Sequence, residues 1–212
     1  MTTSYWNKFY KNKFIFEPSS FAKFVLKKFV KLKKLSLIDV GCGNGRDSFF
    51  FAKKKLNVLG VDNSKTAIIS NNKNLKIKNL KFNLLSIESK KFQKIGKFDI
   101  IYSRFFLHTI NKDQEVKFIK ALKSLSVLNK TLIMLEFRTT KDKMMQKGKK
   151  ISKNENFTDH YRRYINAEKF NNKIKKMGYF KIIYFIEKKG LSNHKNDNPT
   201  LARVIMKRTT KI

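Results

Sequence analysis

The chain has 212 residues, and its 49 lysines and arginines outnumber 15 acidic residues to give a formal net charge of +34. An apolar fraction of 41% excludes a disordered chain, and no apolar run approaches the roughly 20 residues that a membrane-spanning helix needs. The single cysteine, Cys42, excludes an intramolecular disulfide and a cysteine-built metal site, so we expect no metal and a cytoplasmic location.

Apolar patterning predicts helices and strands that alternate along the chain. Residues 17–31 show helical spacing of apolar side chains with Pro18 near the start, which predicts a helix. The short apolar run 35–40 ends at a glycine-rich turn, as a buried parallel strand does. The further predicted elements are a helix at 46–55, strands at 56–62, 79–85 and 97–103, a helix at 113–125, a strand at 130–137, a helix at 166–179, and strands at 181–189 and 200–208.

This alternation indicates an α/β fold, a doubly wound and mostly parallel seven-stranded sheet. The last two strands have no helix between them, so we expect them to pair as an antiparallel hairpin at one edge. No linker or repeat interrupts the pattern, which predicts one domain over residues 1–212. Within it we expect residues 1–35 to form an N-terminal helical cap and residues 139–165, lysine-rich at first, to form an insert or lid.

Three of the eight glycines stand at alternate positions directly after the first predicted strand: Gly41, Gly43 and Gly45. A glycine turn ahead of a helix lets a ligand approach the backbone and attracts anions. The dinucleotide fingerprint G-x-G-x-x-G is broken because Arg46 occupies its last position, and the phosphate loop G-x-x-x-x-G-K-[ST] is absent. The turn therefore indicates a nucleotide site of another kind.

Two acidic residues flank this turn, and their positions indicate the charge of the ligand. Asp39, at the end of the first strand, would face an ammonium or sulfonium group. Asp62, at the end of the second strand, is placed to accept hydrogen bonds from ribose hydroxyls. A ligand with a positive charge and no phosphate fits both residues.

The stretch "LIDVGCGNGRDS…VLGVDNS" resembles the cofactor motif of class I S-adenosylmethionine-dependent methyltransferases. From Leu37 to the C-terminus, the strand order, the fourth-strand motif "KFDIIYS" and the antiparallel last strand also follow that family. The resemblance implies an enzyme with a Rossmann-like fold and S-adenosylmethionine as its cofactor, with the methionine part near Asp39 and the ribose on Asp62. The cofactor-binding residues that it implies are Asp39, Gly41, Cys42, Gly43, Asn44, Arg46, Asp62, Asn63, Ser86, Ile87 and Ser103.

The sequence departs from the family pattern after the third strand. Many relatives carry an aspartate there that contacts the adenine amino group, whereas this chain has Ser86. The adenine contact is therefore expected to rest on Ser86 and the Ile87 backbone. The wider run "YWNKFY…PSSFAKF…YSRFFLHTI…HYRRYI…DNPTLARVI" is similar to compact bacterial methyltransferases of the tellurite-resistance-like type and to ones from surface-polysaccharide loci.

In this family the acceptor enters at the C-terminal ends of strands four and five. Four segments expected there are "SYWNKFYKNKF", "YSRFFLHTI", "LEFR" and "DHYRRYI", which hold four of the seven arginines and two of the three histidines. Arginine binds phosphate or carboxylate oxygens in a bidentate fork, so the group indicates an anion pocket over which 139–165 would close. The expected substrate-binding residues are Arg104, Arg138, Arg162, Arg163, Tyr5 and Trp6, and the expected catalytic residues are His108, His160, Arg104 and Tyr161.

A purely structural interpretation competes at two of these segments. Tyr5 and Trp6 would then belong to a packed helix cap. Tyr161, Tyr164 and Ile165 would form a helical core stripe that leaves the neighbouring arginines in solvent.

The favoured function is methyl transfer to a small anionic acceptor, such as a phosphate, phosphonate, carboxylate or glycan-linked group, at oxygen. An anionic oxygen needs no base, whereas a hydroxyl or amine would give its proton to His108 or His160. The alternative is an RNA methyltransferase that uses the positive charge, and a third reading is a non-catalytic cofactor-binding protein. Lysine is spread along the whole chain, as A/T-rich codons would produce, and this disfavours the RNA alternative. The oligomeric state is left open.

Overall fold

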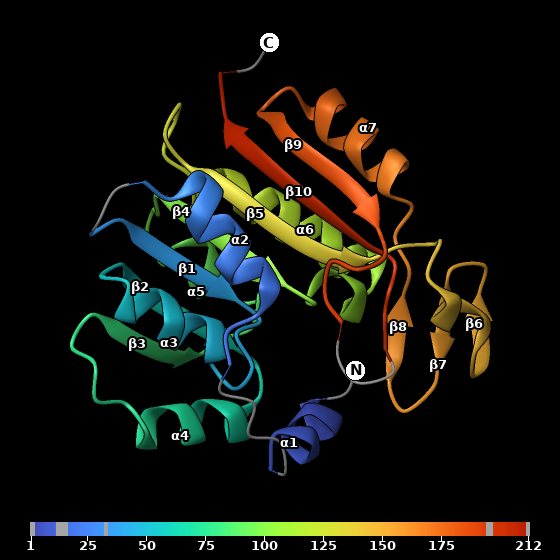
Figure 1. The fold of residues 1–212 in the computed structure, drawn as a ribbon, viewed down its shortest axis with the longest axis horizontal. Helices are drawn as coiled ribbons and strands as arrows, with labels where there is room; N and C mark the ends of the chain where they lie inside the picture. Colours follow the sequence, from blue (N-terminus) through green and yellow to red (C-terminus); the bar gives the residue numbers. More distant parts are fainter. Residues whose placement is uncertain (1–2, 12–16, 32–33, 194–196, 211–212) are drawn as a thin grey trace.

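The computed structural model describes residues 3–11, 17–31, 34–193 and 197–210 of the chain. At its centre lies a seven-stranded sheet with the strand order β3-β2-β1-β4-β5-β10-β9 (Figure 1). The strands are β1 Ser36–Val40, β2 Asn57–Asp62, β3 Leu80–Leu84, β4 Ile100–Arg104, β5 Leu132–Arg138, β9 Phe180–Lys188 and β10 Leu201–Arg208. Each overlaps a strand predicted from the sequence, so the predicted fold class is confirmed.

Strand directions confirm a mostly parallel sheet with an antiparallel last strand. Neighbours from β3 to β5 are parallel, and β10 runs antiparallel to both β5 and β9. The last strand is therefore inside the sheet, and β9 forms the edge. The chain order reverses between β1 and β4, and open α/β sheets bind ligands beyond the carboxyl ends of the strands at such a switch point.

Helices cover both faces of the sheet. One face carries α2 Ser20–Phe29, α3 Arg46–Lys53 and α4 Lys65–Lys73, and the other carries α5 Lys90–Gln93, α6 Lys112–Ser124 and α7 Ala167–Met177. Each group of helices closes its own apolar core, with Phe51 buried in the first and Phe118 in the second. The strands supply both cores because successive side chains of a strand point to opposite faces, as Leu37 and Ile38 do.

Several smaller elements lie beside the C-terminal ends of the strands. They are the helix α1 Thr3–Lys11, the 3₁₀ turns Leu107–Thr109 and Lys143–Gln146, and a three-stranded sheet of β6 Lys149–Ser152, β7 Glu155–Phe157 and β8 Tyr161–Arg163. The small sheet occupies the expected insert, 139–165, and it was not predicted. Because Tyr161–Arg163 is a strand, the helix considered for this segment is wrong, although Tyr161, Tyr164 and Ile165 are all buried as that interpretation expected. Of the expected cap 1–35, residues 1–2, 12–16 and 32–33 lie outside the described residues.

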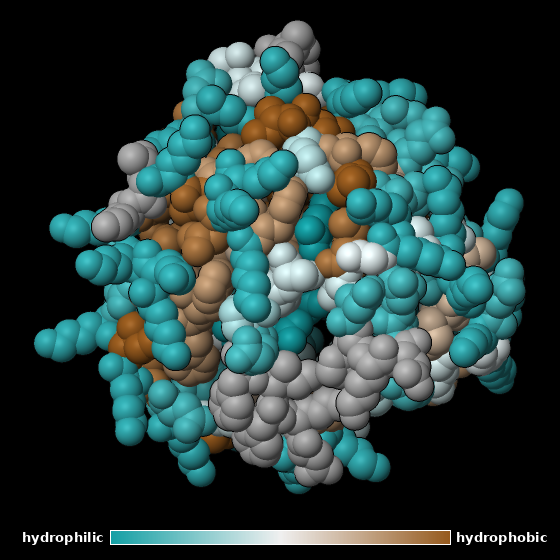
Figure 2. All heavy atoms as spheres, viewed as in Figure 1, coloured by the Kyte–Doolittle hydropathy of each residue, from teal (hydrophilic) through white to brown (hydrophobic). Residues whose placement is uncertain are grey.

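Two further features concern membrane-spanning helices and the distribution of hydrophilic side chains on the surface. Within the described parts of the chain, no helix has both the length and the apolarity needed to cross a membrane. Hydrophilic side chains, teal in Figure 2, project from all sides of the visible face, with apolar surface between them. No single hydrophilic patch dominates this face, in agreement with lysines that are spread along the whole sequence.

Candidate active site

A cavity of about 600 Å³ lies at the C-terminal ends of β1, β2, β4 and β5. Each of these strands contributes a residue near its end to the cavity wall: Asp39, Asp62, Arg104 and Arg138, respectively. Further parts of the wall come from α1, from residues 17–20, from the glycine turn and the start of α3, from the residues after β3 and β4, from the insert, and from the loop between β9 and β10. The cavity thus coincides with the switch point of the sheet, where the sequence motifs also converge.

The glycine turn forms one end of this cavity. All three of its glycines have a positive φ, namely 75°, 54° and 72° at Gly41, Gly43 and Gly45. The Gly43 N–H donates to Asp62 Oδ2 (2.9 Å), and the Gly43 carbonyl accepts from Asn71 Nδ2 (2.8 Å). A Cβ atom at Gly43 would collide with the ring of Tyr10. Glycine is therefore required here both by the backbone and by close approach.

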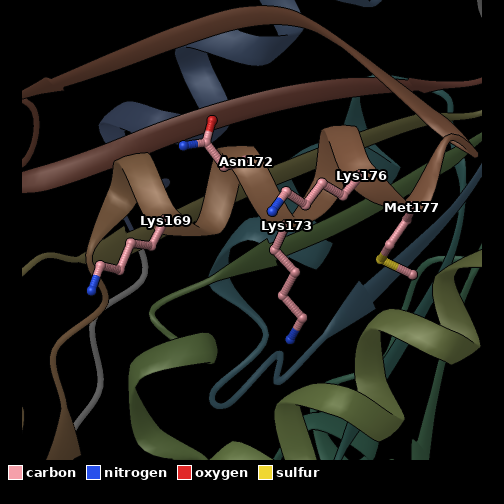
Figure 3. A pocket seen from close by; sticks show the side chains of 5 residues that line it. All are labelled: Lys169, Asn172, Lys173, Lys176 and Met177. Carbon is pink, nitrogen blue, oxygen red and sulfur yellow. The ribbon is translucent and has the colours of Figure 1, made fainter.

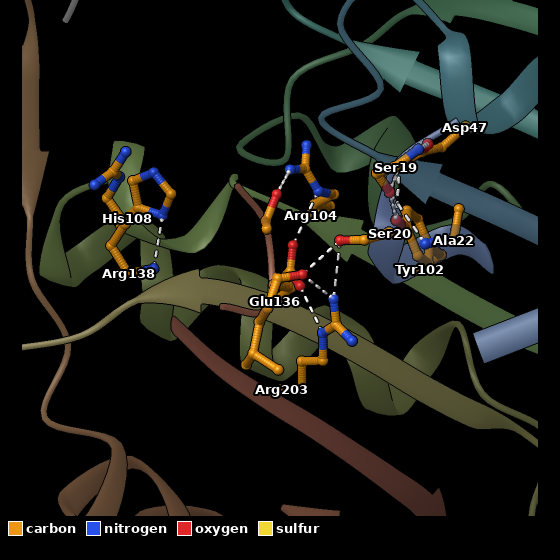
Figure 4. A network of polar contacts seen from close by, with 12 residues as sticks. Ser19, Ser20, Ala22, Asp47, Tyr102, Arg104, His108, Glu136, Arg138 and Arg203 are labelled. Atoms are coloured by element: carbon orange, nitrogen blue, oxygen red, sulfur yellow. Dashed lines mark hydrogen bonds and ion pairs between the residues drawn. The ribbon is translucent and has the colours of Figure 1, made fainter. Parts of the chain in front are cut away.

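Two buried carboxylates lie near each other at this end. Asp39, 3% exposed, accepts a hydrogen bond from Ser48 Oγ (2.6 Å). Burial and the charge of Asp47 raise the pKa of Asp39 to about 8. Asp47 accepts from the backbone N–H and hydroxyl of Ser19 (2.7 Å each) and from the Tyr102 hydroxyl (2.8 Å), as Figure 4 shows. A cation beside Asp39 would favour its ionised form, so this end suits a positively charged ligand.

Asp62 lies at the same end, in the cavity wall. Its Oδ1 atom accepts from the Ser64 N–H (2.8 Å), beside the bond from Gly43. Burial raises the pKa of Asp62, although both backbone N–H groups favour its ionised form. The predicted cofactor residues that line the cavity are Asp39, Gly41, Cys42, Asn44, Arg46, Asp62, Asn63, Ser86 and Ile87.

Arg104, at the end of β4, belongs to a buried ion network at the other end of the cavity. Its Nε donates to Glu136 Oε1 (2.9 Å) and its Nη2 donates to Ser192 Oγ (2.9 Å). Arg203 Nε binds the other oxygen of Glu136 (2.7 Å), so one carboxylate from β5 holds guanidinium groups from β4 and β10 (Figure 4). This sharing holds the Arg104 side chain at a defined place in the wall.

Arg138 and His108 form a second polar group on the same side. The Arg138 guanidinium binds Asp142 (2.8 Å) and also Asp197. The backbone N–H of Arg138 donates to Nδ1 of His108 (3.2 Å), and Figure 4 draws this contact. Burial and the charge of Arg138 hold the pKa of His108 well below its usual value. His108 is therefore neutral with Nδ1 engaged, and Nε2 carries a proton that it can donate.

His160 and Arg162 reach the cavity from the insert and meet α1 there. The His160 ring lies 4.6 Å from the ring of Tyr5 and 4.9 Å from that of Trp6, between centroids. Asp159 accepts from the Tyr5 hydroxyl (2.6 Å) and from Arg162 Nη1 (2.7 Å). Burial and the charge of Arg162 lower the pKa of His160 to about 4, so this ring is also neutral near pH 7.

Four predicted site residues do not line the cavity. Arg163 binds Glu115 (2.5 Å) and the carbonyl of Ile110 (3.0 Å). Tyr161 donates to Glu155 (2.7 Å), and Ser103 donates to the Val40 carbonyl (2.8 Å). The fourth, Gly43, lies under the ring of Tyr10. Arg163, Tyr161 and Ser103 therefore have structural partners where the sequence indicated ligand contacts.

Other wall residues were missed by sequence reasoning. Among them are Asp47, Phe105, Ser192 and Asp197. Asp47 carried a signal, because it directly follows the glycine motif at the start of α3. Ser192 and Asp197 carried none, since they lie in an irregular loop whose place is set by the pairing of β9 with β10.

A second hollow lies on α7, away from the strand ends. Figure 3 shows its lining, Lys169, Asn172, Lys173, Lys176 and Met177, on this one helix. Lys173 is bound to Glu115 (2.8 Å). No aromatic, histidine or acidic side chain lines this hollow, so it offers no catalytic group.

Comparison with solved structures agrees with this geometry. An S-adenosylmethionine-dependent methyltransferase from Anabaena variabilis is 22% identical over 97% of this chain and 93% of its own, with a TM-score of 0.74. One from Clostridium acetobutylicum is 16% identical over 96% of each chain, with a TM-score of 0.69. TehB from Haemophilus influenzae is 16% identical over 97% of this chain and 66% of its own, with a TM-score of 0.67. No curated protein sequence matches the chain.

The fold is thus that of S-adenosylmethionine-dependent methyltransferases. A family model described as a methyltransferase domain matches residues 31–200, and the chain belongs to this family. The predicted enzyme class and Rossmann-like fold are confirmed, and the expected likeness to tellurite-resistance methyltransferases is confirmed by TehB. Two further structural neighbours contain bound S-adenosylmethionine, which supports the predicted cofactor.

Proposed function

We propose that this enzyme transfers the methyl group of S-adenosylmethionine to an oxygen of a small acceptor that carries a phosphate, phosphonate, carboxylate or glycan-linked anionic group. One observation carries the proposal. The cavity wall contains none of the described lysines, although lysine supplies most of the 49 basic residues, but it contains four of the seven arginines: Arg46, Arg104, Arg138 and Arg162. The planar guanidinium fork matches carboxylate and phosphate oxygens, which a lysine ammonium does not.

The end of the cavity near the glycine turn fits the cofactor. Asp39 and Asp47 have no ion-pair partner among the described residues, and a sulfonium or ammonium group bound beside Asp39 would favour its ionised form. Asp62, in the wall at the end of β2, would accept hydrogen bonds from the ribose hydroxyls. Of the three glycines only Gly41 lines the cavity, and there the backbone would approach the ligand directly.

Arg46 would bind the methionine carboxylate of the cofactor. It is the first residue of α3, and it lines the cavity. Within the described residues its guanidinium has no hydrogen bond or ion pair, unlike those of Arg104, Arg138 and Arg162. A carboxylate placed there would gain from both the guanidinium and the N-terminus of the helix.

The remaining residues would place the acceptor. When bound, S-adenosylmethionine supplies a methyl group already activated by the sulfonium charge, so the protein has to align the acceptor and exclude water. Arg104, Arg138 and Arg162 would hold the anionic group, while the rings of α1 cover the cavity. His108 and His160 are neutral, and no base is needed for an anionic oxygen. We also propose that 139–165 is the lid that brings His160 and Arg162 to the acceptor.

The proposal is tested with cofactor that carries a radiolabelled methyl group. The protein is incubated with it and with a cell extract separated into metabolite, glycan and RNA fractions. Label is expected in the metabolite or glycan fraction, and the Asp62→Ala variant should lose it. Label that appears only in RNA and disappears on ribonuclease treatment would contradict the proposal, because the charge of the whole molecule would then be the functional feature.

We place the enzyme in the cytoplasm, since its single cysteine fits a compartment that keeps thiols reduced. Fractionation of cells that produce the tagged protein checks this location. Recovery with the membrane fraction at low and high salt would contradict it.

A further inference from the structure

Phe105, directly after β4, has a backbone conformation that is unusual for its residue type. Its φ is 55°, in the left-handed region that bulky side chains rarely adopt. Three other non-glycine residues share this feature, Lys34, Lys55 and Asn129, and all three are exposed. Phe105 differs because it is partly buried and lines the cavity. Such strain persists only where the surrounding structure holds it, and it is concentrated at functional sites.

The surroundings of Phe105 account for how the strained backbone is held. Its N–H donates to the carbonyl of Glu136 (2.9 Å), which extends the pairing of β4 with β5 by one residue. The chain then turns immediately into the 3₁₀ turn Leu107–Thr109. The end of the strand and the start of the turn together fix the conformation of the residue between them.

The ring of Phe105 does not serve either apolar core. Its neighbour Phe106 packs against the core that contains Phe118, but Phe105 belongs to neither core cluster. Its ring instead contacts the polar groups of the acceptor side. The Arg104 guanidinium lies 3.9 Å from the ring centroid, that of Arg138 lies at 5.9 Å, and the His108 ring lies at 5.3 Å in an edge-on arrangement.

We propose that Phe105 is a positioning residue for acceptor binding. Its ring is a platform that orients the guanidinium of Arg104, and less closely that of Arg138, toward the anionic group of the acceptor. Glu136 and Ser192 already bind the edge of the Arg104 guanidinium, and the aromatic face restrains its plane. In its strained conformation Phe105 places an aromatic ring against both guanidinium groups. This inference rests on the function proposed above, because that function supplies the negative charge of the acceptor.

Two substitutions at Phe105 distinguish the effect of the aromatic ring from the effect of the backbone strain. Phe105→Ala removes the ring and keeps the strain, whereas Phe105→Gly removes both. Both variants are expected to raise the acceptor KM about tenfold with a smaller change in kcat, and Phe105→Tyr is expected to restore it. Phe105→Gly should melt at a higher temperature than Phe105→Ala. Lys55→Gly, which relieves similar strain on the surface, should leave the acceptor KM unchanged.

Inorganic phosphate serves as the anion probe before the acceptor is identified. Trp6, the only tryptophan, lines the cavity, so its fluorescence reports occupancy in the presence of the cofactor. Phosphate should bind about tenfold more weakly to Phe105→Ala and Phe105→Gly than to the parent protein and Phe105→Tyr. Equal phosphate affinity in the parent, Ala and Gly proteins would overturn the proposal.

A spectroscopic measurement distinguishes failure of this inference from failure of the proposed function. With only seven arginines, the Nε–H signals can be assigned by substitution. The Arg104 Nε–H signal should be shifted by the ring current of Phe105, and the shift should vanish in Phe105→Ala and survive in Phe105→Tyr. If the parent protein methylates only uncharged acceptors but shows this shift, the anionic acceptor is wrong and the positioning role stands. An unchanged signal in Phe105→Ala overturns the positioning role in either case.

Discussion

At the scale of single residues, the buried carboxylates in and around the cavity differ in whether an arginine binds them. Asp39 and Asp47 accept hydrogen bonds from hydroxyl groups and a backbone N–H, and neither forms an ion pair among the described residues. Glu136 and Asp142, which do not line the cavity, each bind an arginine that does, Arg104 and Arg138. A cation bound near the glycine turn would therefore meet carboxyl groups that have no cation beside them and would favour the ionised form of Asp39, while the guanidinium groups of Arg104 and Arg138 are already held in place.

The raised pKa of Asp39 predicts a pH dependence of stability. The native carboxyl titrates at about 8, far above its value near 3.9 in an unfolded chain, so the native state holds a proton that the unfolded state has lost. The contribution of Asp39 to stability without cofactor, measured as the difference between the parent and Asp39→Asn, should therefore fall as the pH rises between about 4 and 8, by at most about 1.4 kcal/mol per pH unit. Urea unfolding of the parent and of Asp39→Asn measures this. A slope that is unchanged in Asp39→Asn would contradict the assignment.

His160 predicts a dependence of opposite sign at lower pH. Its native pKa is about 4, below the usual value near 6.5, because burial and Arg162 disfavour the charged ring. The unfolded chain binds the proton first, so stability should be lost as the pH falls from about 6.5 to about 4. Arg162→Ala should move the transition upward, and Trp6 fluorescence can follow it because the two rings are in contact. Arg208→Ala, whose guanidinium lies beside Tyr179, is the control and should leave the transition in place.

Asp62 gives a direct test of the cofactor end. Asp62→Ala removes the proposed acceptor for the ribose hydroxyls and also the partner of the Gly43 N–H. Cofactor affinity measured by calorimetry should fall by tenfold or more, since hydrogen bonds to a charged group contribute about 1.5–3 kcal/mol. Asp113→Ala, an exposed carboxylate at the start of α6, is the matched control. Equal affinity in Asp62→Ala and the parent would refute the ribose assignment.

At the scale of elements, α1 differs from the helices that cover the sheet. None of its residues is fully buried, and its aromatic rings are only partly buried, against His160 and Gly43. Asn7 accepts from the Ser64 hydroxyl (2.8 Å) and the Thr66 N–H (3.2 Å) at the start of α4, and Tyr5 binds Asp159 of the insert. The helix thus spans both ends of the cavity and is held mainly by polar contacts at its two sides.

Loss of these contacts should release α1 without unfolding the domain. Asn7→Ala is expected to speed amide hydrogen exchange in α1 and to shift Trp6 emission toward that of solvated tryptophan. The melting temperature should change little, because neither apolar core includes α1. Lys8→Ala on the exposed side of the same helix is the control. A large loss of global stability in Asn7→Ala would show that α1 is part of the folding unit instead.

At the scale of the whole molecule, the charge of +34 opposes the compact state. Like charges on the native surface repel, and salt screens this repulsion because the Debye length falls from about 30 Å at 0.01 M to about 3 Å at 1 M. The melting temperature should therefore rise with sodium chloride over this range. A fall with salt would mean that the eleven ion pairs of the described residues that involve lysine or arginine outweigh the repulsion.

The sequence by itself determined where the seven strands lie along the chain, the position of the glycine turn, and the acidic residues at the ends of the first two strands. These features are local: a buried strand needs an unbroken apolar run, and the turn needs glycine at positions with a positive φ. Antiparallel pairing of the last two strands was also predictable, because no helix separates them.

Only the tertiary structure decided which charged residues reach the cavity. Arg162 and Arg163 are adjacent in sequence and of the same type, but β8 points them to opposite faces, so that Arg162 lines the cavity and Arg163 binds Glu115. The sequence pattern allowed a helix there, and a helix would have placed them otherwise. The left-handed turn at Phe105 and the contacts of Ser192 and Asp197 likewise depend on strands far apart in the chain. Such long-range pairings leave no local pattern, and this is why the wall of the acceptor site could not be predicted residue by residue.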